Sequence, residues 1–208
     1  MPKFKTNQEL FWRGQFGNEY IVRNQSEELL AANLHFFAKA LENINKLNSI
    51  FEVGCNIGMN FAALQLLFPD VKNTGIEINE KAAEIARQLK NTAEIINDSI
   101  VNFDSNRTFD LVFSKGVLIH LNPDELPSVY KKMAKLSGKY VLIAEYFNPA
   151  PVSLTYRGHE DRLFKRDFAN EFMGANPEFK LRSYAFHYKN VNNFSQDNIT
   201  WFLMERES

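Results

Sequence analysis

Two acids and two glycines flank short apolar runs in an order that could bind a nucleoside. Glu52 ends the run Ile50-Phe51-Glu52-Val53, and Gly54 and Gly58 follow in a turn of small residues. Glycine lacks the Cβ atom that would keep a ligand away from the backbone, and it permits a positive φ. Glu77 closes the next apolar run. Glu77 lies nineteen residues past Gly58. An acid at this distance along the chain is placed to hold the two hydroxyls of a ribose.

The spacing of these residues separates two classes of cofactor. The dehydrogenase fingerprint G-x-G-x-x-G, started at Gly54, would need glycine at Asn56 and Met59, and it fails at both. The pattern Glu-x-Gly-x-(Gly/Asn)-x-Gly fits Glu52, Gly54, Asn56 and Gly58, and asparagine tolerates the left-handed conformation of such a turn. With this pattern the chain resembles the class I S-adenosylmethionine (SAM)-dependent methyltransferases, which implies SAM as the cofactor. A strand–helix turn without a ligand is the alternative.

Composition sets the outer limits. The chain has 208 residues, of which 45% are hydrophobic and 24% charged, and its net charge is −1. These values favour one globular domain and give no field that would attract nucleic acid or an anionic membrane. Cys55 is the single cysteine, no signal-peptide pattern opens the sequence, and no apolar run is long enough to span a membrane. We expect a cytoplasmic protein.

Strand and helix patterns alternate between residues 49 and 147. Strands are expected near 50–53, 71–78, 93–96, 109–114 and 139–147, and the intervening helices near 59–68, 79–89 and 123–136. Ser26 predicts the cap of an earlier helix. This alternation predicts an α/β fold with a doubly wound, mostly parallel sheet. The resemblance implies seven strands, the last two (180–189 and 199–205) forming an antiparallel pair.

Ligands gather at the carboxyl ends of the strands in such a sheet. Five separate segments bring residues to that edge, and the resemblance implies that Asp98 meets the adenine amino group. A turn-forming aspartate is the alternative for Asp98. The expected cofactor-binding residues are Glu52, Gly54, Asn56, Gly58, Glu77, Ile78, Asp98, Ser99 and Ser114.

Residues 1–25 show neither a helical nor a strand period and are rich in aromatic side chains. Such a segment cannot build a core of its own, so we expect it to lie across a methyltransferase domain of residues 26–208. It is either a strap over apolar surface or a lid over the site, which would exclude water. The expected acceptor-binding residues are Trp12, Arg13, Tyr20, Arg23, Tyr156 and Arg157.

Three segments narrow the resemblance. Phe11-Trp12-Arg13-Gly14-Gln15-Phe16-Gly17, the stretch 115–121 and the stretch 156–168 look like those of methylases associated with pseudaminic acid biosynthesis. This resemblance implies a small-molecule acceptor, a sugar or sugar nucleotide of a bacterial surface-glycan (nonulosonic acid) pathway. Residues 114–117 lack the Asn/Asp-Pro-Pro-aromatic tetrapeptide of adenine-N6 methyltransferases, which disfavours nucleic acid. Methylation of a quinone-like ring, or a non-catalytic SAM-binding subunit, stays open.

Proton removal from a hydroxyl acceptor would require a base within hydrogen-bond reach. His120 follows the fourth expected strand, and His159 and Tyr146 lie after or at the end of the fifth. These three are the candidate catalytic residues, with Glu145 next in line, and no metal is expected. A histidine that packs beside a helix start, or simply lies in a loop, is the alternative for His120 and His159.

Basic residues cluster after the fifth strand. Phe164, Phe168 and Phe172 recur every four residues, which predicts a helix on which Arg162 and Arg166 share one face. Arg157 precedes that helix and could grip a phosphate or carboxylate of an anionic acceptor. A solvated helix face with local ion pairs is the alternative.

Overall fold

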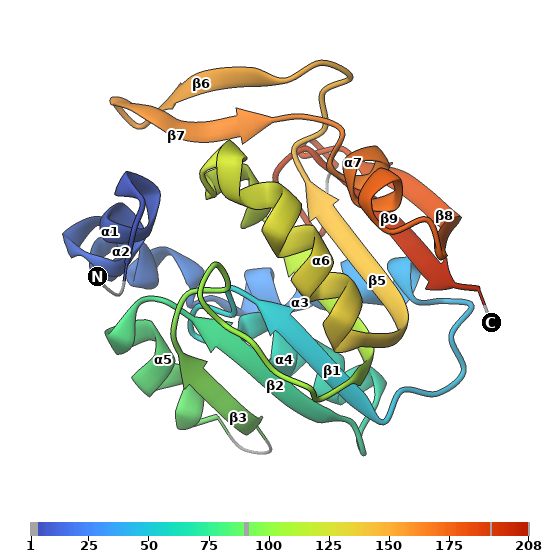
Figure 1. Ribbon diagram of the computed structural model, residues 1–208. Helices are drawn as coiled ribbons and strands as arrows, with labels where there is room; N and C mark the ends of the chain where they lie inside the picture. The colour runs from blue at the N-terminus through green and yellow to red at the C-terminus, as the bar shows by residue number, and fades with distance from the viewer. Residues whose placement is uncertain (1–3, 90–91, 192, 208) are drawn as a thin grey trace.

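The computed structural model describes residues 4–89, 92–191 and 193–207. Seven strands form one sheet in the order β3-β2-β1-β4-β5-β9-β8 (Figure 1). Its parallel part comprises β1 (Ser49–Val53), β2 (Lys72–Glu77), β3 (Thr92–Asn97), β4 (Phe109–Lys115) and β5 (Ser137–Glu145). Strands β9 (Ile199–Arg206) and β8 (Phe179–His187) join antiparallel at one edge. The predicted fold class is confirmed.

Helices cover both faces of the sheet. On one face α3 (Glu27–Ala40), α4 (Met59–Leu67) and α5 (Glu80–Arg87) pack over Ile50, and on the other α6 (Leu126–Leu136) and α7 (Phe168–Ala175) pack over Phe51. Ile50 and Phe51 are both fully buried. Because successive residues of a strand point to opposite faces, burial on both sides explains the continuous apolar runs of the central strands.

The helix cap predicted at Ser26 is confirmed, and Asn79 caps a second helix in the same way. Ser26 accepts a hydrogen bond from the backbone N–H of Leu29 at the start of α3. Asn79 does the same for Ala82 at the start of α5. Each cap satisfies a backbone donor that the first turn of a helix leaves unpaired.

The N-terminal segment is helical, which corrects the prediction that it lacks regular structure. It forms α1 (Asn7–Arg13), α2 (Gln15–Ile21) and a short 3₁₀ helix, η1 (Val22–Asn24). Thr6 and Glu9 start α1 through a reciprocal capping box, in which each side chain accepts from the other's backbone N–H. Gly14 is extended and separates the two helices. Two helices of seven residues are too short to show a helical stripe in the sequence.

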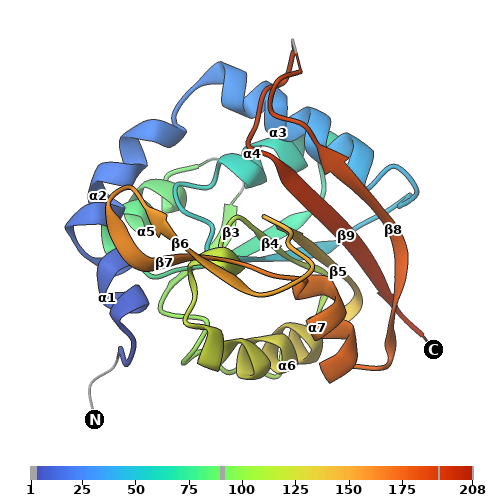
Figure 2. The same ribbon diagram turned by 90° about the horizontal axis from the view of Figure 1, so that it is seen from above.

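The stretch around Arg162 and Phe164, which was expected to be helical, is instead the second strand of a hairpin, β6 (Val152–Tyr156) and β7 (His159–Lys165). Arg157 and Gly158 have φ angles of 50° and 83°, the two positive values that a tight type I′ turn requires. Helix α7 begins only at Phe168. Figure 2 shows the hairpin lying over the sheet, from α1 and α2 at one side to α7 at the other.

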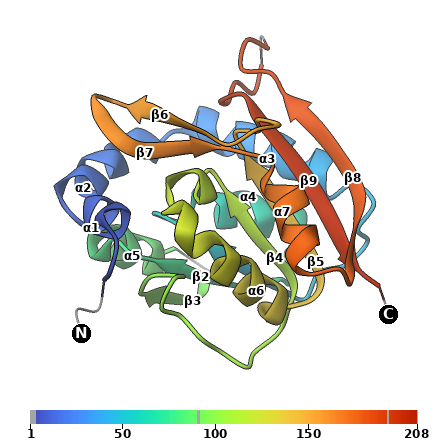
Figure 3. The same ribbon diagram turned by 45° about the horizontal axis from the view of Figure 1, so that its top comes forward.

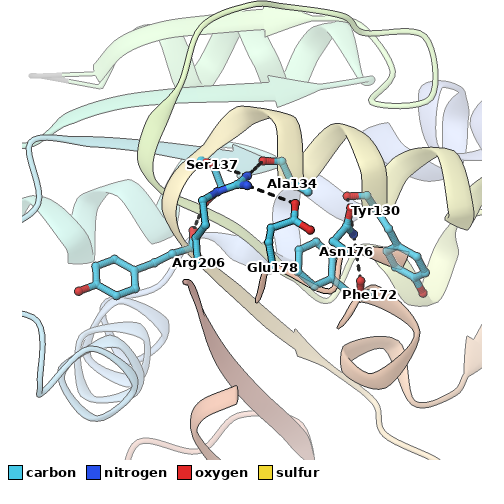
Figure 4. A network of polar contacts seen from close by, with 8 residues as sticks. Tyr130, Ala134, Ser137, Phe172, Asn176, Glu178 and Arg206 are labelled. Atoms are coloured by element: carbon cyan, nitrogen blue, oxygen red, sulfur yellow. Dashed lines mark hydrogen bonds and ion pairs between the residues drawn. The ribbon is translucent and has the colours of Figure 1, made fainter. Parts of the chain in front are cut away.

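A polar network ties the C-terminal elements to α6 (Figure 4). Arg206 Nη2 donates to the carbonyl oxygens of Ala134 and Ser137 at 2.6 and 3.1 Å, and Arg206 Nη1 donates to Glu178 at 3.2 Å. Asn176 Nδ2 donates to the carbonyl oxygen of Tyr130 on α6 at 3.4 Å and to that of Phe172 on α7 at 2.9 Å. These bonds fix β9 and α7 against α6. In the described residues no helix is long and apolar enough to cross a membrane.

Candidate cofactor and acceptor site

A cavity of about 960 Å³ opens at the carboxyl ends of the parallel strands. Its walls come from these strand ends, from α1 and α2, from the hairpin turn and from the loop between β8 and β9. The structure brings twelve of the predicted site residues to this cavity: Trp12, Tyr20, Gly54, Asn56, Glu77, Ile78, Asp98, Ser99, His120, Tyr146, Tyr156 and Arg157. Six others do not line it: Arg13, Arg23, Glu52, Gly58, Ser114 and His159.

The glycine turn after β1 has three residues with left-handed backbone. Gly54, Asn56 and Gly58 have φ angles of 71°, 46° and 84°. A Cβ atom at Gly54 would lie 2.7 Å from a methyl of Val117, and one at Gly58 would lie 2.4 Å from a methyl of Leu89. Gly58 therefore serves the packing of the turn, whereas Gly54 also lines the cavity.

Glu77 joins this turn to the next strand. Its Oε2 accepts from the backbone N–H of Asn56 at 2.8 Å, and its Oε1 accepts from that of Asn79 at 2.7 Å. Burial raises the pKa of Glu77, against the effect of these two hydrogen bonds. A carboxylate oxygen can accept two hydrogen bonds, so both oxygens keep capacity for a ligand.

Glu52 and Lys115 are two further ionisable residues near the turn. Glu52 Oε1 accepts from Asn60 Nδ2 at 2.6 Å, whereas Oε2 is buried without a partner among the described residues. Burial raises the pKa of Glu52 to about 8 and lowers that of Lys115 to about 8. Lys115 Nζ donates to Asn33 Oδ1 at 3.1 Å. Lys115 and Asn33 line the cavity and were missed in the sequence, where nothing marks them except the position of Lys115 at a strand end.

Ser114 and Glu145 are turned away from the cavity. Ser114 Oγ donates to Glu145 Oε1 at 2.6 Å, and the same oxygen accepts from the backbone N–H groups of Val117 and Leu118 at 3.1 and 3.0 Å. Glu145 is 1% exposed, and burial raises its pKa to about 7. The carboxylate thus holds the short turn η2 (Leu118–His120) against the sheet. Ser114 was predicted to bind the cofactor and Glu145 was a further candidate base, but neither residue lines the cavity.

His120 ends that turn at the cavity wall and is 7% exposed. Its Nδ1 lies 2.6 Å from the carbonyl oxygen of Arg162 on β7. A carbonyl oxygen can only accept, so Nδ1 carries the proton and Nε2 keeps a lone pair. Burial lowers the pKa of His120 to about 4, against the effect of the bond to Arg162. The imidazole is therefore a neutral base at pH 7.

The other two candidate bases are less suitable. The exposed His159 packs on the rings of Phe11 and Phe16, with centroids 4.9 and 5.7 Å apart, outside the cavity. Tyr146 lines the cavity, but its hydroxyl donates to Asp197 at 2.6 Å and burial raises its pKa. Of the three predicted catalytic side chains, His120 alone presents a basic lone pair at the cavity.

Aromatic rings close the cavity beside His120. The Trp12 ring centroid lies 4.6 Å from that of His120 and 5.2 Å from that of Tyr20, and Tyr156 lies 4.8 Å from His120. Figure 3 shows α1 and α2 beside α5, with the hairpin reaching them. Arg13 is exposed and stacks on Phe4, and Arg23 is exposed. The N-terminal segment therefore offers aromatic rings to the site but not these two arginines.

The basic residues of the hairpin do not form one cluster. Arg157 lines the cavity. Arg162 lies over Phe11, with its Cζ 5.1 Å from the ring centroid. Arg166 forms an ion pair with Glu171 at 2.7 Å. In the part of the chain that the structure describes, no group of three acidic, histidine or cysteine residues could hold a metal ion.

Comparison with known proteins now supplies the enzyme class. Residues 50–138 match the family described as a methyltransferase domain. No curated protein matches the chain at a significant level. The domain match and the shared fold together confirm a SAM-dependent methyltransferase with SAM as its cofactor.

Solved methyltransferase structures share the fold of this methyltransferase at low identity. Magnesium protoporphyrin IX methyltransferase (ChlM) from Synechocystis PCC 6803, with bound SAM, is 13% identical with a TM-score of 0.70, covering 99% of this chain and 100% of that one. The plantazolicin methyltransferase BpumL in complex with SAH is 13% identical with a TM-score of 0.68, covering 97% and 94%. The sugar N-methyltransferase KedS8 from Streptoalloteichus sp ATCC 53650 is 18% identical with a TM-score of 0.65, covering 92% and 93%.

The matched domain supplies only part of the methyltransferase cavity. It contains the glycine turn, Glu77, Asp98 and His120, whereas Trp12 and Tyr156 lie outside residues 50–138. The wall that contains Trp12 and Tyr156 therefore comes from segments outside the matched domain. We expect these segments to determine which acceptor binds.

Proposed function

We propose that this methyltransferase transfers the methyl group of SAM to a hydroxyl of a sugar or sugar nucleotide in a bacterial surface-glycan (nonulosonic acid) pathway. The observation that carries the proposal is the bond from His120 Nδ1 to the Arg162 carbonyl oxygen at the cavity wall. It leaves a neutral imidazole whose Nε2 can take the proton that the sugar hydroxyl must lose during methyl transfer.

The residues present fit SAM. Glu77 would accept from the ribose hydroxyls with the capacity that its oxygens retain. Lys115 lines the cavity and would offer its ammonium group to the carboxylate of the methionine end, whereas the buried Glu52 lies behind the turn. When bound, SAM supplies a methyl group that its sulfonium makes electrophilic.

His120 would act during transfer rather than before it. As the acceptor oxygen bonds to the methyl carbon, the sulfur–carbon bond breaks and Nε2 of His120 takes the hydroxyl proton. The products are the methyl ether and S-adenosylhomocysteine. Trp12 and Tyr156 cover the imidazole and would exclude water, which keeps the base neutral and the acceptor aligned.

The acceptor end of the cavity combines rings with hydrogen-bonding groups. Tyr146 and Tyr156 line it together with Asn190, Gln196 and Asp197 from the β8–β9 loop. Aromatic faces with several amide and carboxyl groups suit a polyhydroxylated acceptor, and the sugar N-methyltransferase among the structural neighbours supports this class. Arg157 at the mouth would meet a phosphate or carboxylate.

A quinone-like ring is the second candidate acceptor, because the rings of Trp12, Tyr20 and Tyr156 could stack on a flat aromatic molecule. Such an acceptor would leave the remaining hydrogen-bonding capacity of the amide and carboxyl groups of the β8–β9 loop unused. That mismatch favours the sugar.

Release of S-adenosylhomocysteine tests the function. The purified protein would be incubated with SAM and a panel of nucleotide sugars, acidic sugars and phenolic rings, and the methylated product identified by mass spectrometry. We expect turnover with a sugar, a loss of about 10²–10⁴-fold in kcat for His120→Asn, and unchanged SAM affinity. Tyr146→Phe is the matched control and should retain the base. SAM binding without turnover would indicate a non-catalytic subunit, and turnover with phenols alone would indicate a ring acceptor.

A further inference from the structure

Glu9 on α1 is a buried carboxylate at the cavity to which the proposed function gives no role. It is 3% exposed. Its Oε2 accepts from the backbone N–H groups of Lys5 and Thr6 at 2.9 Å each and from the Thr6 hydroxyl at 3.1 Å. Its Oε1 is buried and has no hydrogen-bond partner among the described residues. A buried carboxylate oxygen is costly without a donor, so its place at the cavity points to a donor on a ligand.

The end of β3 faces the same part of the cavity. Asp98, Ser99 and Ile100 follow this strand and line the cavity together with Glu9, and Ile78 adds a second apolar side chain from the end of β2. Burial raises the pKa of Glu9, but the nearby Ser99 hydroxyl and the backbone N–H groups of Lys5 and Thr6 outweigh this and lower it. The Ser99 hydroxyl is not positioned to donate to Oε1, so this oxygen still lacks a donor. This end of the cavity therefore combines two carboxylates with apolar side chains.

Helix α1 is held in place, so Glu9 is not on a loose strap. Gln8 Nε2 donates to the carbonyl oxygen of Asp161 on β7 at 3.1 Å. At the other end of the helix, Asn79 Nδ2 donates to the carbonyl oxygens of Trp12 and Arg13, at 3.3 Å each. The hairpin and the cofactor turn thus fix α1 from two sides (Figure 3).

A group suited to this place is flat, apolar on its faces and carries two donor hydrogens on its edge. An adenine ring with its exocyclic amine meets each requirement, because the amine is a donor with two N–H bonds and a carboxylate only accepts. The ribose hydroxyls and the methionine carboxylate of SAM have other partners in the proposed site, namely Glu77 and Lys115.

We propose that Glu9 is a cofactor-binding residue: its Oε1 accepts one N–H of the adenine amino group of SAM, and Asp98 accepts the other. The N-terminal helix then takes part in recognising the nucleobase and does not merely cover the site. The inference rests on the proposed SAM site and is independent of the acceptor and of the catalytic base.

The variant Glu9→Gln tests the assignment without removing the helix cap, because glutamine also completes a capping box. The amide oxygen must take the place of Oε2 to accept from Thr6, so the amide NH₂ takes the place of Oε1. It then faces the adenine amine as a second donor. With S-inosylhomocysteine, which carries an oxygen in place of the amine, the same NH₂ would find an acceptor.

Calorimetry with S-adenosylhomocysteine and S-inosylhomocysteine measures this preference. We expect the wild type to favour the adenine compound and Glu9→Gln to bind it about 10- to 100-fold more weakly, the range of a hydrogen bond to a charged group. The ratio of the two dissociation constants should fall by at least tenfold in the variant.

Thr6→Ala is the matched control, since it weakens the cap of α1 but keeps the Glu9 carboxylate. Its ratio of dissociation constants should equal that of the wild type. An unchanged ratio in Glu9→Gln, or an equal change in Thr6→Ala, would overturn the assignment while the wild type still binds the adenine compound. A wild type that binds neither compound would overturn the proposed function as well.

Discussion

Asn79 Nδ2 donates a hydrogen bond to the carbonyl oxygen of Trp12 over 3.3 Å, across 66 intervening residues. The backbone N–H of Asn79 donates to Glu77 Oε1 at 2.7 Å, and its Oδ1 caps α5. One residue therefore joins the acid expected at the ribose, the start of α5 and the segment that covers the cavity. Gly17 permits this approach, because a Cβ atom there would lie 2.8 Å from Asn79 Nδ2.

Asn79→Asp should detach α1 and α2 and leave α5 intact. Aspartate is as good a helix cap as asparagine, but it has no NH₂ and places a carboxylate against the carbonyl oxygens of Trp12 and Arg13. We expect faster amide hydrogen exchange throughout residues 7–21, unchanged exchange in residues 80–87 and weaker SAM binding. Asn18→Ala, which removes only one acceptor of the amide, should have a smaller effect. Unchanged exchange in α1 and α2 would show that aromatic packing alone holds them.

Glu77→Ala should weaken SAM binding by roughly 2–3 kcal/mol, the range for a charged hydrogen bond left unmade. The substitution also removes the acceptor of the Asn56 and Asn79 N–H groups, so the melting temperature should fall as well. Calorimetry at a temperature where the variant is folded separates the two effects. A folded Glu77→Ala protein with the wild-type SAM dissociation constant would exclude the ribose assignment.

The sheet was predictable from the sequence because its strands are buried on both faces. Phe51 and Val112 pack under α6, whereas Ile50 and Leu111 pack under the helices of the other face, so successive positions of these strands are apolar. The glycine turn was predictable for a local reason: its left-handed residues must be glycine or a residue such as Asn56 that tolerates positive φ.

The hairpin was missed because a spacing of four imitated a helix. Phe164 lies on β7, whereas Phe168 and Phe172 lie on α7, so the repeat crosses a junction between a strand and a helix. Gly158 after Arg157 was a turn signal that could have predicted the hairpin. No local pattern could reveal Glu9 or Lys115 as cavity residues, because their surroundings are set by contacts distant in sequence.

Lowering the pH should destabilise the protein through His120. Burial lowers its pKa in the folded state to about 4, below the ordinary value of 6.5. The unfolded chain therefore binds the proton more readily between these values. The stabilisation is complete above about pH 6.5 and is lost as the pH falls toward 4, by roughly 3 kcal/mol at about 1.4 kcal/mol per unit of pKa.

Urea unfolding of wild type and His120→Asn between pH 7 and 4 measures this loss. Asparagine does not titrate, and its amide can still donate to the Arg162 carbonyl oxygen. Burial raises the pKa values of Glu52 and Glu145, so these two groups also make stability depend on pH. Both proteins contain them, so their contributions cancel in the difference in unfolding free energy. A difference that stays constant over this range would mean that His120 is not held neutral by the fold.

Arg157 is the residue placed to recognise a negative charge on the acceptor. It lies in the hairpin turn with φ of 50° and lines the cavity while its side chain remains exposed. A planar guanidinium grips a phosphate or carboxylate with two hydrogen bonds. We expect Arg157→Ala to raise the KM of an anionic sugar acceptor about tenfold and to leave SAM affinity unchanged. The effect is no larger because solvent weakens an ion pair made by an exposed side chain.

Two comparisons separate charge recognition from the shape of the turn. Arg157→Lys keeps the charge without the planar fork and should recover only part of the affinity. Arg166→Ala removes an arginine that is paired with Glu171 outside the cavity, so it should alter stability and leave KM unchanged. The effect of Arg157→Ala should shrink for an uncharged analogue of the acceptor. Equal losses for charged and neutral acceptors would mean that Arg157 only shapes the hairpin turn, and the proposal of an anionic acceptor would then fail.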